Sequence, residues 1–204
     1  MNNPLFDIHT HRPDAPVNAF INIPMEVLAG DMPFTPSPEN SYSAGIHPMF
    51  EGNWEKAFRQ LKHISLEPHV KAIGECGLDR RSKTPISSQI TYFQQQINLA
   101  VQQNKPLIIH CVHSWDVLMA ICQPSTVPFI VHGFRGKPQL AQQLLRAGFA
   151  LSFGSYFNPK SLKICPSDKY YIETDDNPHL TIQQVADLHA LALRDESPKN
   201  EAFL

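Results

Sequence analysis

The sequence predicts an α/β protein whose strands close into a distorted, TIM-like (β/α)8 barrel, and three observations lead to this fold class. The chain has 204 residues, a length that one domain can accommodate. Eight short apolar runs recur along it, and segments with helical periodicity separate several of them. The later runs are apolar without strict alternation, which is typical of strands buried on both faces of a parallel sheet. We therefore expect one domain over residues 1–204, with an open α/β sheet as the alternative.

Each element follows from its local pattern, in chain order. The predicted strands are residues 5–8, 19–23, 42–46, 70–74, 107–109, 129–131, 150–153 and 170–172. Apolar residues spaced three and four apart predict helices over residues 54–64, 87–104, 117–121, 140–145 and 182–192. The early part of the chain has little room for helices, because about ten residues separate the first two runs and residues 24–41 are rich in proline. We expect a barrel with shortened or missing early helices.

Composition excludes several classes of protein. The formal net charge of -2 argues against nucleic-acid binding through an extended basic face. No apolar run is long enough to span a membrane, and the first residues do not resemble a secretion signal. The four cysteines include no C-x-x-C pair, so a structural zinc site is unsupported and reduced thiols are expected. We expect a soluble cytoplasmic protein without a membrane association, and no protein partner is indicated.

Side chains that can bind metal ions follow most of the predicted strands. These residues are His9, His11, His47, Glu75, His110, His132 and Asp175. All strands of a parallel barrel end at one face, and that face carries the active site in barrel enzymes. Side chains that are far apart in the sequence would therefore meet in one pocket.

Imidazole and carboxylate groups held rigidly around an open position are what a hydrolytic metal site requires. Two ions about 3.5–4 Å apart usually share a carboxylate, and Glu75 lies where such a bridge is needed. Taken alone, His110 could be an ordinary interior histidine, and Asp175 could merely cap the next helix. Their occurrence together at six strand ends favours a metal site. The absence of thiolate ligands leaves Zn, Mg, Mn and Ni open.

Six motifs, taken in order, resemble the TatD family of metal-dependent hydrolases, which belong to the amidohydrolase-like barrels. They are H-T-H at 9–11, G-I-H-P at 45–48, A-I-G-E-C-G-L-D at 72–79, P-L-I-I-H-C at 106–111, V-H-G-F-R-G at 131–136 and I-E-T-D at 172–175. The match runs from about residue 5 to residue 175, and residues 199–204 faintly resemble the closing helix of the family. The G-E-x-G-L-D and E-T-D motifs are specific in combination.

The resemblance implies a distorted TIM barrel with two divalent metal ions and hydrolysis of phosphodiester bonds in DNA, often as a 3′-5′ exonuclease. It assigns His9, His11, Glu75 and Asp175 to one ion and Glu75, His110 and His132 to the second. Asp175 would act as the general base and Glu75 as the bridging carboxylate, which makes both catalytic. His47 would contact the substrate near the scissile phosphate.

Basic residues on the loops after the strands suit an anionic substrate, and we expect Arg80 and Arg135 to contribute to its binding. Two departures from the family pattern bear on the substrate. The stretch 12–41 is short, and the basic loop that normally follows the E-T-D motif is missing after Asp176. Two alternatives to a deoxyribonuclease therefore stay open. One is a hydrolase of a small phosphodiester, ester or amide, and the other is a binding module that keeps the metals but catalyses weakly.

Overall fold

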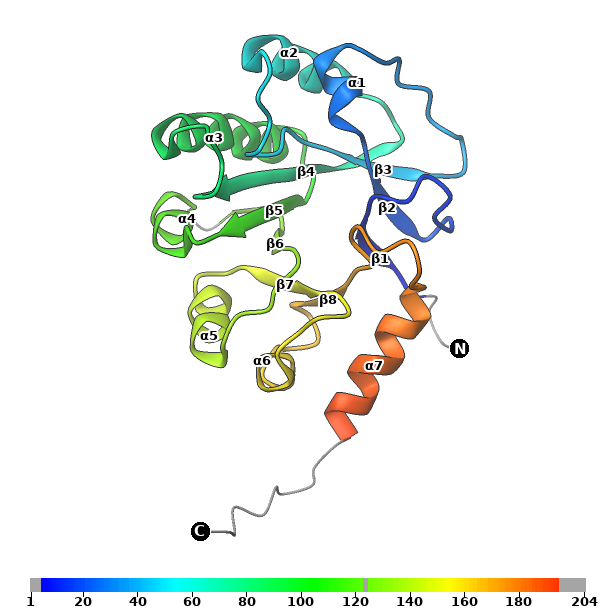
Figure 1. Ribbon diagram of the computed structural model, residues 1–204, viewed down its shortest axis with the longest axis vertical. Helices are drawn as coiled ribbons and strands as arrows, with labels where there is room; N and C mark the ends of the chain where they lie inside the picture. The colour runs from blue at the N-terminus through cyan, green and yellow to red at the C-terminus, as the bar shows by residue number, and fades with distance from the viewer. Residues whose placement is uncertain (1–4, 123–124, 195–204) are drawn as a thin grey trace.

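The chain folds into a closed barrel of eight parallel strands, as the sequence predicts (Figure 1). A computed structural model describes residues 5–122 and 125–194. Each strand pairs with the next one along the chain, and β1 also pairs with β8, where Asp7 lies opposite Ile172. Closure brings the carboxyl ends of all eight strands to one face. The interpretation of residues 1–204 as one domain stays a prediction.

The strands are β1 (Asp7–Thr10), β2 (Ala19–Asn22), β3 (Ser41–Ala44), β4 (Val70–Asp79), β5 (Leu107–Val112), β6 (Phe129–Val131), β7 (Ala150–Phe153) and β8 (Tyr170–Ile172). The helices are α1 (Met25–Ala29), α2 (Trp54–Ile64), α3 (Ile86–Gln102), α4 (Trp115–Ile121), α5 (Pro138–Arg146), α6 (Pro159–Lys163) and α7 (Ile182–Arg194). Helices α2 to α6 lie outside the strands (Figure 1). The predicted alternation of strands and helices is confirmed from β3 onward.

The early helices are shortened, as expected. No helix joins β1 to β2 in the described part of the chain, and α1 between β2 and β3 has only five residues. Gly30 ends α1 with a φ of 78°, a left-handed conformation that glycine adopts without steric cost. The first fully formed helix is α2, where the Asn53 side chain accepts a hydrogen bond from the backbone N–H of Lys56.

Three strands continue beyond their predicted ends. Strand β1 extends to Thr10, so His9 lies within it. Strand β4 extends to Asp79 and β5 to Val112, so Glu75 and His110 lie within strands rather than after them. These predicted ends were wrong because the prediction ended each strand at the first polar residue after its apolar run. In the barrel, a strand continues past such a residue when its side chain faces the mouth. Glycine allows β4 to pass close to β3: a Cβ atom added to Gly45 would lie 2.5 Å from the Cα atom of Gly74.

Helix α6 was not predicted, because its five residues contain one large apolar side chain and therefore no stripe. Its first turn is capped by Asn158, which accepts hydrogen bonds from the backbone N–H groups of Lys160 and Ser161. The resemblance of residues 199–204 to a closing helix concerns residues outside the described ranges. Among the described helices, none has the length and apolar character that crossing a membrane requires.

The main hydrophobic core lies between the strands and the surrounding helices and includes Leu61, Phe93 and Leu144. A smaller cluster joins Ile8 on β1 to Ile130 on β6 and Ala150 on β7. These strands are not neighbours of β1 in the barrel, so the cluster fills the barrel interior. The four cysteines are free, as expected. The apolar interior leaves the polar side chains gathered at the mouth.

Candidate metal centre

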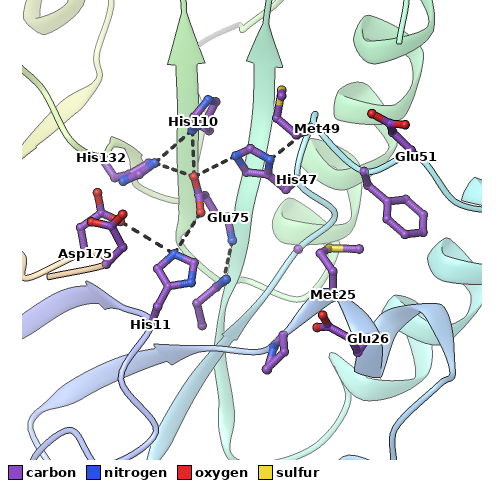
Figure 2. Close-up of a pocket in the computed structure, with 15 residues that line it drawn as sticks. His11, Met25, Glu26, His47, Met49, Glu51, Glu75, His110, His132 and Asp175 are labelled. Carbon is purple, nitrogen blue, oxygen red and sulfur yellow. Dashed lines mark hydrogen bonds and ion pairs between the residues drawn. The ribbon is translucent and has the colours of Figure 1, made fainter. Parts of the chain in front are cut away.

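The carboxylate of Glu75 lies at the centre of the barrel mouth, surrounded by histidines from four other strands or strand ends (Figure 2). Its Oε2 atom is 3.4 Å from Nε2 of His9 and 3.4 Å from Nε2 of His11. Its Oε1 atom lies 3.2 Å from His47 Nε2, 2.8 Å from His110 Nδ1 and 2.8 Å from His132 Nε2. The predicted convergence on Glu75 is therefore present in the fold.

Asp175 is fixed against β1 by backbone hydrogen bonds. Its N–H donates to the carbonyl of His9, and its own carbonyl accepts from the N–H of His11. The residue has a φ of 54°, which aspartate tolerates better than most residues because its short side chain can bond locally. Its Oδ1 atom consequently lies 3.7 Å from Nε2 of His9 and 3.8 Å from Nε2 of His11.

A buried hydrogen-bond cluster beneath these residues locks β8 to β1. The Thr174 hydroxyl donates to Oδ2 of Asp7 at 2.6 Å, and the Thr174 N–H donates to Oδ1 of the same carboxylate at 3.1 Å. The N–H of His9 also donates to Asp7 Oδ1. Burial raises the pKa of Asp7 to about 6 despite these hydrogen bonds. The cluster sets the positions of His9 and Asp175 from below.

Carboxylates also contact the outer nitrogens of the two histidines on β5 and after β6. His110 Nε2 lies 3.0 Å from Oδ2 of the buried Asp79, and His132 Nδ1 lies 3.5 Å from Oε1 of the buried Glu173. Arg81 forms an ion pair with Asp79 at 2.7 Å. Although burial opposes ionisation, Arg81 and His110 hold the pKa of Asp79 well below its usual range. Such carboxylate–histidine contacts orient imidazole rings in metal sites.

Three buried or half-buried amide side chains hold the strand ends that carry the donors. Gln96 on α3 accepts from the N–H of Ile46 at 2.7 Å and donates to its carbonyl at 3.1 Å, which fixes the residue before His47. Gln89, also on α3, makes the equivalent pair of bonds to the backbone of Asp79. Asn22 on β2 accepts from the N–H of Glu75 at 3.0 Å. Each amide provides a hydrogen-bond partner for the backbone close to the metal centre.

The close packing of opposite charges determines protonation at the centre. Burial favours the neutral acid at Glu75, but His132, His11 and His110 outweigh it and hold the pKa of Glu75 well below its usual value. Burial favours neutral His132, but the negative charges of Glu75 and Glu173 raise the pKa of His132 well above 6.5. Positive charge is therefore favoured at this location, whether protons or metal ions supply it.

The residues present fit divalent metal ions. His9 is completely buried, and neither of its ring nitrogens has a hydrogen-bond partner among the described residues. Burying an unpaired imidazole costs free energy, which a bond to a metal ion would offset. Four groups of donors at the centre could each hold an ion. They are His9 with His11 and Asp175, His9 with Glu75 and His132, His47 with Glu75 and His110, and His132 with Glu173 and Asp175. Nitrogen and oxygen donors without thiolates suit Zn, Mn, Mg or Ni.

A cavity of about 700 Å3 opens above these donors. One wall carries His11, His132 and Asp175. Figure 2 shows Met25, Glu26, Met49 and Glu51 on the side away from Asp175, beyond His47. A pocket of this size accepts a small ligand or one unit of a polymer.

The structure brings together all six metal ligands predicted from the sequence and places His47 among them, in contact with Glu75 rather than only near a substrate. Arg80 and Arg135 do not line this cavity. Arg80 lies 3.5 Å from Asp116, and Arg135 lies against the ring of Tyr156. Their predicted roles in substrate binding stay predictions.

Sequence reasoning missed the residues that support the donors. Asp79 ends the G-L-D motif and Glu173 begins the E-T-D motif, which was a usable signal. Gln89 and Gln96 stand seven residues apart on the buried side of α3, although the many glutamines in that helix conceal this pattern.

Comparisons with known proteins find related sequences and a similar fold. A family model described as TatD related DNase matches residues 36–190. The 3′-5′ ssDNA/RNA exonuclease TatD of Erwinia billingiae is 30% identical over 146 residues, which make up 65% of this chain and 56% of that protein. The uncharacterized metal-dependent hydrolase YabD of Bacillus subtilis is 34% identical over 132 residues, or 59% of this chain and 52% of that protein.

A solved structure shares the fold. The TatD homologue YjjV from Escherichia coli K12 superposes with a TM-score of 0.66 at 18% sequence identity, covering 92% of this chain and 95% of that chain. By contrast, this chain spans about half the length of the curated relatives it matches.

Proposed function

Because this chain belongs to the TatD-related DNase family, we propose that it is a metal-dependent hydrolase that cleaves phosphodiester bonds in single-stranded nucleic acid. The observation that carries the proposal is the position of Glu75, whose two carboxylate oxygens lie within 3.4 Å of five imidazole nitrogens. Such a cluster is electrostatically favourable for divalent ions and too costly for a purely structural interior. The relatives named as TatD are 3′-5′ ssDNA/RNA exonucleases, and we extend that activity to this chain as part of the proposal.

Two divalent ions are proposed, with Glu75 shared between them. Following the division that the family resemblance implies, His9, His11, Glu75 and Asp175 would hold one ion, and Glu75, His110 and His132 the other. The short distances from Glu75 to these imidazoles support its shared role. When bound, the ions supply Lewis-acid stabilisation of the charge that develops on the phosphate and lower the pKa of water. The nitrogen and oxygen donors leave Zn, Mg, Mn and Ni as candidates.

The chain's own residues position the water and the substrate. The side chain of Asp175 is 26% exposed, so it reaches the cavity while its backbone is fixed to β1. We assign it the acceptance of the proton from the attacking water. Asp79 and Glu173 hold the imidazoles of His110 and His132 in place, so that the donors do not have to reorganise during the reaction.

A second candidate function is the hydrolysis of a small phosphodiester, ester or amide. It is favoured by the cavity wall beyond His47, where Glu26 and Glu51 lie beside Met25 and Met49. Among the described residues that line the cavity there is no lysine or arginine, so this wall has no such cation to pair with an anionic polymer. The third reading is a module that keeps the metals without useful catalysis. A cytoplasmic location without membrane or protein partners belongs to the same proposal.

Turnover by the metal-loaded full chain tests the proposal. We expect hydrolysis of both a single-stranded oligonucleotide and bis(4-nitrophenyl) phosphate, abolished by a chelator and restored by added metal. Asp175→Asn should remove activity on both substrates, whereas Asp187→Asn, which changes an exposed carboxylate on α7, should not. Turnover of the small diester alone would favour the second candidate. Bound metal without any turnover would contradict the hydrolase proposal.

A further inference from the structure

Two further hollows continue from the metal centre toward the loop between β7 and α6. The nearer one, of about 280 Å3, shares Asp175 and Asp176 with the main cavity. The outer one, of about 730 Å3, shares Arg135, Ser155 and Tyr156 with the nearer one. Because they share lining residues, the three hollows lie next to one another, in order from the candidate ligands outward.

The outer hollow presents an aromatic ring between cationic side chains. Tyr156 is 69% exposed, so packing within the chain does not explain its position. The guanidinium carbon of Arg135 lies 5.5 Å from the centre of its ring, and the exposed Lys160 lines the same hollow. Within residues 5–122 and 125–194, neither cation forms an ion pair with a carboxylate. Exposed rings beside cations are the usual means of holding single-stranded nucleic acid.

The loop that presents Tyr156 is anchored on both sides of the residue. The carbonyl of Gly154 accepts a hydrogen bond from Nε2 of His189 on α7 at 2.8 Å. The next ring along the chain, Phe157, packs edge-to-face on the same His189 with their centres 4.4 Å apart. Asn158 then caps α6. Because the backbone is fixed on both sides, little conformational entropy is lost when a ligand stacks on Tyr156.

The opposite side of the metal centre has the opposite electrostatic character. Its wall carries Glu26 and Glu51, and the nearby Lys83 is already paired with Glu51 at 3.0 Å. A phosphate chain that extended in this direction would meet carboxylates. The same chain extending past Asp175 would pass the exposed Asp176 and then meet Arg135 and Lys160, the only cations that line the described hollows on this side.

We propose that the hollow formed by Arg135, Tyr156 and Lys160 binds the part of a nucleic-acid single strand that lies beyond the nucleotide being removed. A base stacks on Tyr156, and Arg135 and Lys160 contact the phosphates on either side of that base. The inference rests on the proposed function for its ligand class. It adds that the bound nucleic acid extends from the metal centre toward β7 and α6 rather than toward α1 and α2.

The kinetic test compares a dinucleotide with a longer single-stranded oligonucleotide on the metal-loaded full chain. The wild type should show a lower KM for the longer strand. Tyr156→Ala should raise the KM of the longer strand roughly tenfold or more and remove its advantage over the dinucleotide. Tyr156→Phe should retain the advantage, because the ring is kept. The matched control is Phe6→Ala, which removes an exposed ring at the opposite end of the barrel, before β1.

Salt dependence separates the charged contacts from stacking. Arg135→Ala and Lys160→Ala should each lower the slope of log KM against log salt for the longer strand by about 0.7. Arg146→Ala, an exposed cation at the end of α5, should leave the slope as it is. Tyr156→Ala should raise KM with little change in slope.

Binding without turnover keeps this inference separate from the proposed function. Fluorescence anisotropy of a labelled oligonucleotide in the presence of chelator should show weaker binding by Tyr156→Ala than by Phe6→Ala or the wild type. This result would support the strand site even if no hydrolysis were found. Equal binding and equal KM in Tyr156→Ala and wild type would overturn it. An equal rise in KM for the dinucleotide and for the longer oligonucleotide would also overturn it, because it would indicate a structural role for Tyr156.

Discussion

The floor and the rim of the barrel mouth are built differently. The floor comprises His9, His11, His47, Glu75, His110, His132 and Asp175, and all seven side chains come from strands or their immediate ends. The rim comprises Glu26, Glu51, Arg80, Arg135, Tyr156 and Lys160, which lie on loops or at helix starts. Floor side chains are mostly buried and in mutual contact, whereas Tyr156 is 69% exposed and the Arg80 side chain 46%.

This difference separates two questions about the molecule. The floor determines whether chemistry occurs, because its charges are coupled and its backbone is held by strands and buried amides. The rim determines which substrate is bound, because exposed side chains contribute individually and weakly. Substitutions in the floor should therefore affect every substrate, and substitutions in the rim should affect only long or anionic ones.

The largest effect is expected for Glu75→Gln. The substitution keeps the shape but removes the negative charge that faces five imidazoles, so metal binding and charge stabilisation are both lost. A loss of several kcal/mol corresponds to a fall in kcat/KM of roughly three orders of magnitude or more on every substrate. Steady-state kinetics measures it, with the exposed Glu55→Gln on α2 as the control. Activity near wild type would contradict the assignment of Glu75.

Asp79→Asn tests the support beneath the floor and should have a smaller effect. The residue contacts Nε2 of His110 from behind, so the substitution should raise the metal concentration for half-maximal activity by about 10–100-fold. Activity at saturating metal should recover most of the wild-type value. Asp116→Asn, which removes an exposed carboxylate, serves as the comparison. A fall in activity that saturating metal does not restore would place Asp79 in the reaction itself.

His189 on α7 anchors the loop that carries Tyr156, and its hydrogen bonds fit the neutral imidazole. Nε2 donates to the carbonyl of Gly154, which leaves Nδ1 to accept from the Tyr170 hydroxyl at 2.7 Å. His189→Phe should lower the free energy of unfolding by about 1–3 kcal/mol, because the half-buried Tyr170 hydroxyl and Gly154 carbonyl lose their partner. Denaturant unfolding measures the difference, and the exposed His63→Gln should change it little.

The same residue predicts a pH dependence. Burial lowers the pKa of His189 below 6.5, so its contribution to stability is complete above the unfolded-state pKa of about 6.5. As the pH falls below that value, the unfolded chain binds a proton that the folded chain does not, and stability decreases. The difference in free energy of unfolding between wild type and His189→Phe should therefore become smaller as the pH falls below 6.5. A gap that widens in this range would contradict the neutral buried form.

The sequence is sufficient to predict the barrel and the convergence of the six candidate metal ligands, because both depend on local patterns. Apolar runs identify strands, and parallel closure then brings residues such as His9 and His132 to one face wherever they stand in the chain. The positions of the strand ends could not be predicted in the same way. Glu75 and His110 end apolar runs, yet they lie within β4 and β5, because the barrel mouth accommodates polar side chains.

The supporting residues depend on contacts between distant segments. Gln96 is buried because the end of β3 lies against α3 and needs partners for the backbone of Ile46. Its position three residues after Phe93 puts it on the buried side of α3, unlike the exposed Gln95, but nothing local shows which backbone groups it meets. The orientation of the Arg80 side chain is likewise set by its ion pair with Asp116, which lies on α4. Such pairings appear only when the fold is known.

The smallest effect is expected for Arg80→Ala at the rim. Its guanidinium already pairs with Asp116, and an exposed pair of this kind contributes about 0–1 kcal/mol. The KM for an oligonucleotide should rise by no more than about threefold, a smaller change than that for Arg135→Ala. Side-by-side kinetics of the two variants measures this ranking. A larger rise in KM for Arg80→Ala than for Arg135→Ala would indicate that the bound nucleic acid lies over β4 and α4 instead.

The most direct measurement for the account as a whole is a calorimetric titration of the metal-free chain with a divalent ion such as Zn2+ or Mn2+. We predict two ions per chain for the wild type and loss of tight binding to both sites in Glu75→Gln, since the one carboxylate serves both. Failure of the wild type to bind, or the same stoichiometry and affinity in both proteins, would contradict the claim that these side chains converge to form a metal centre.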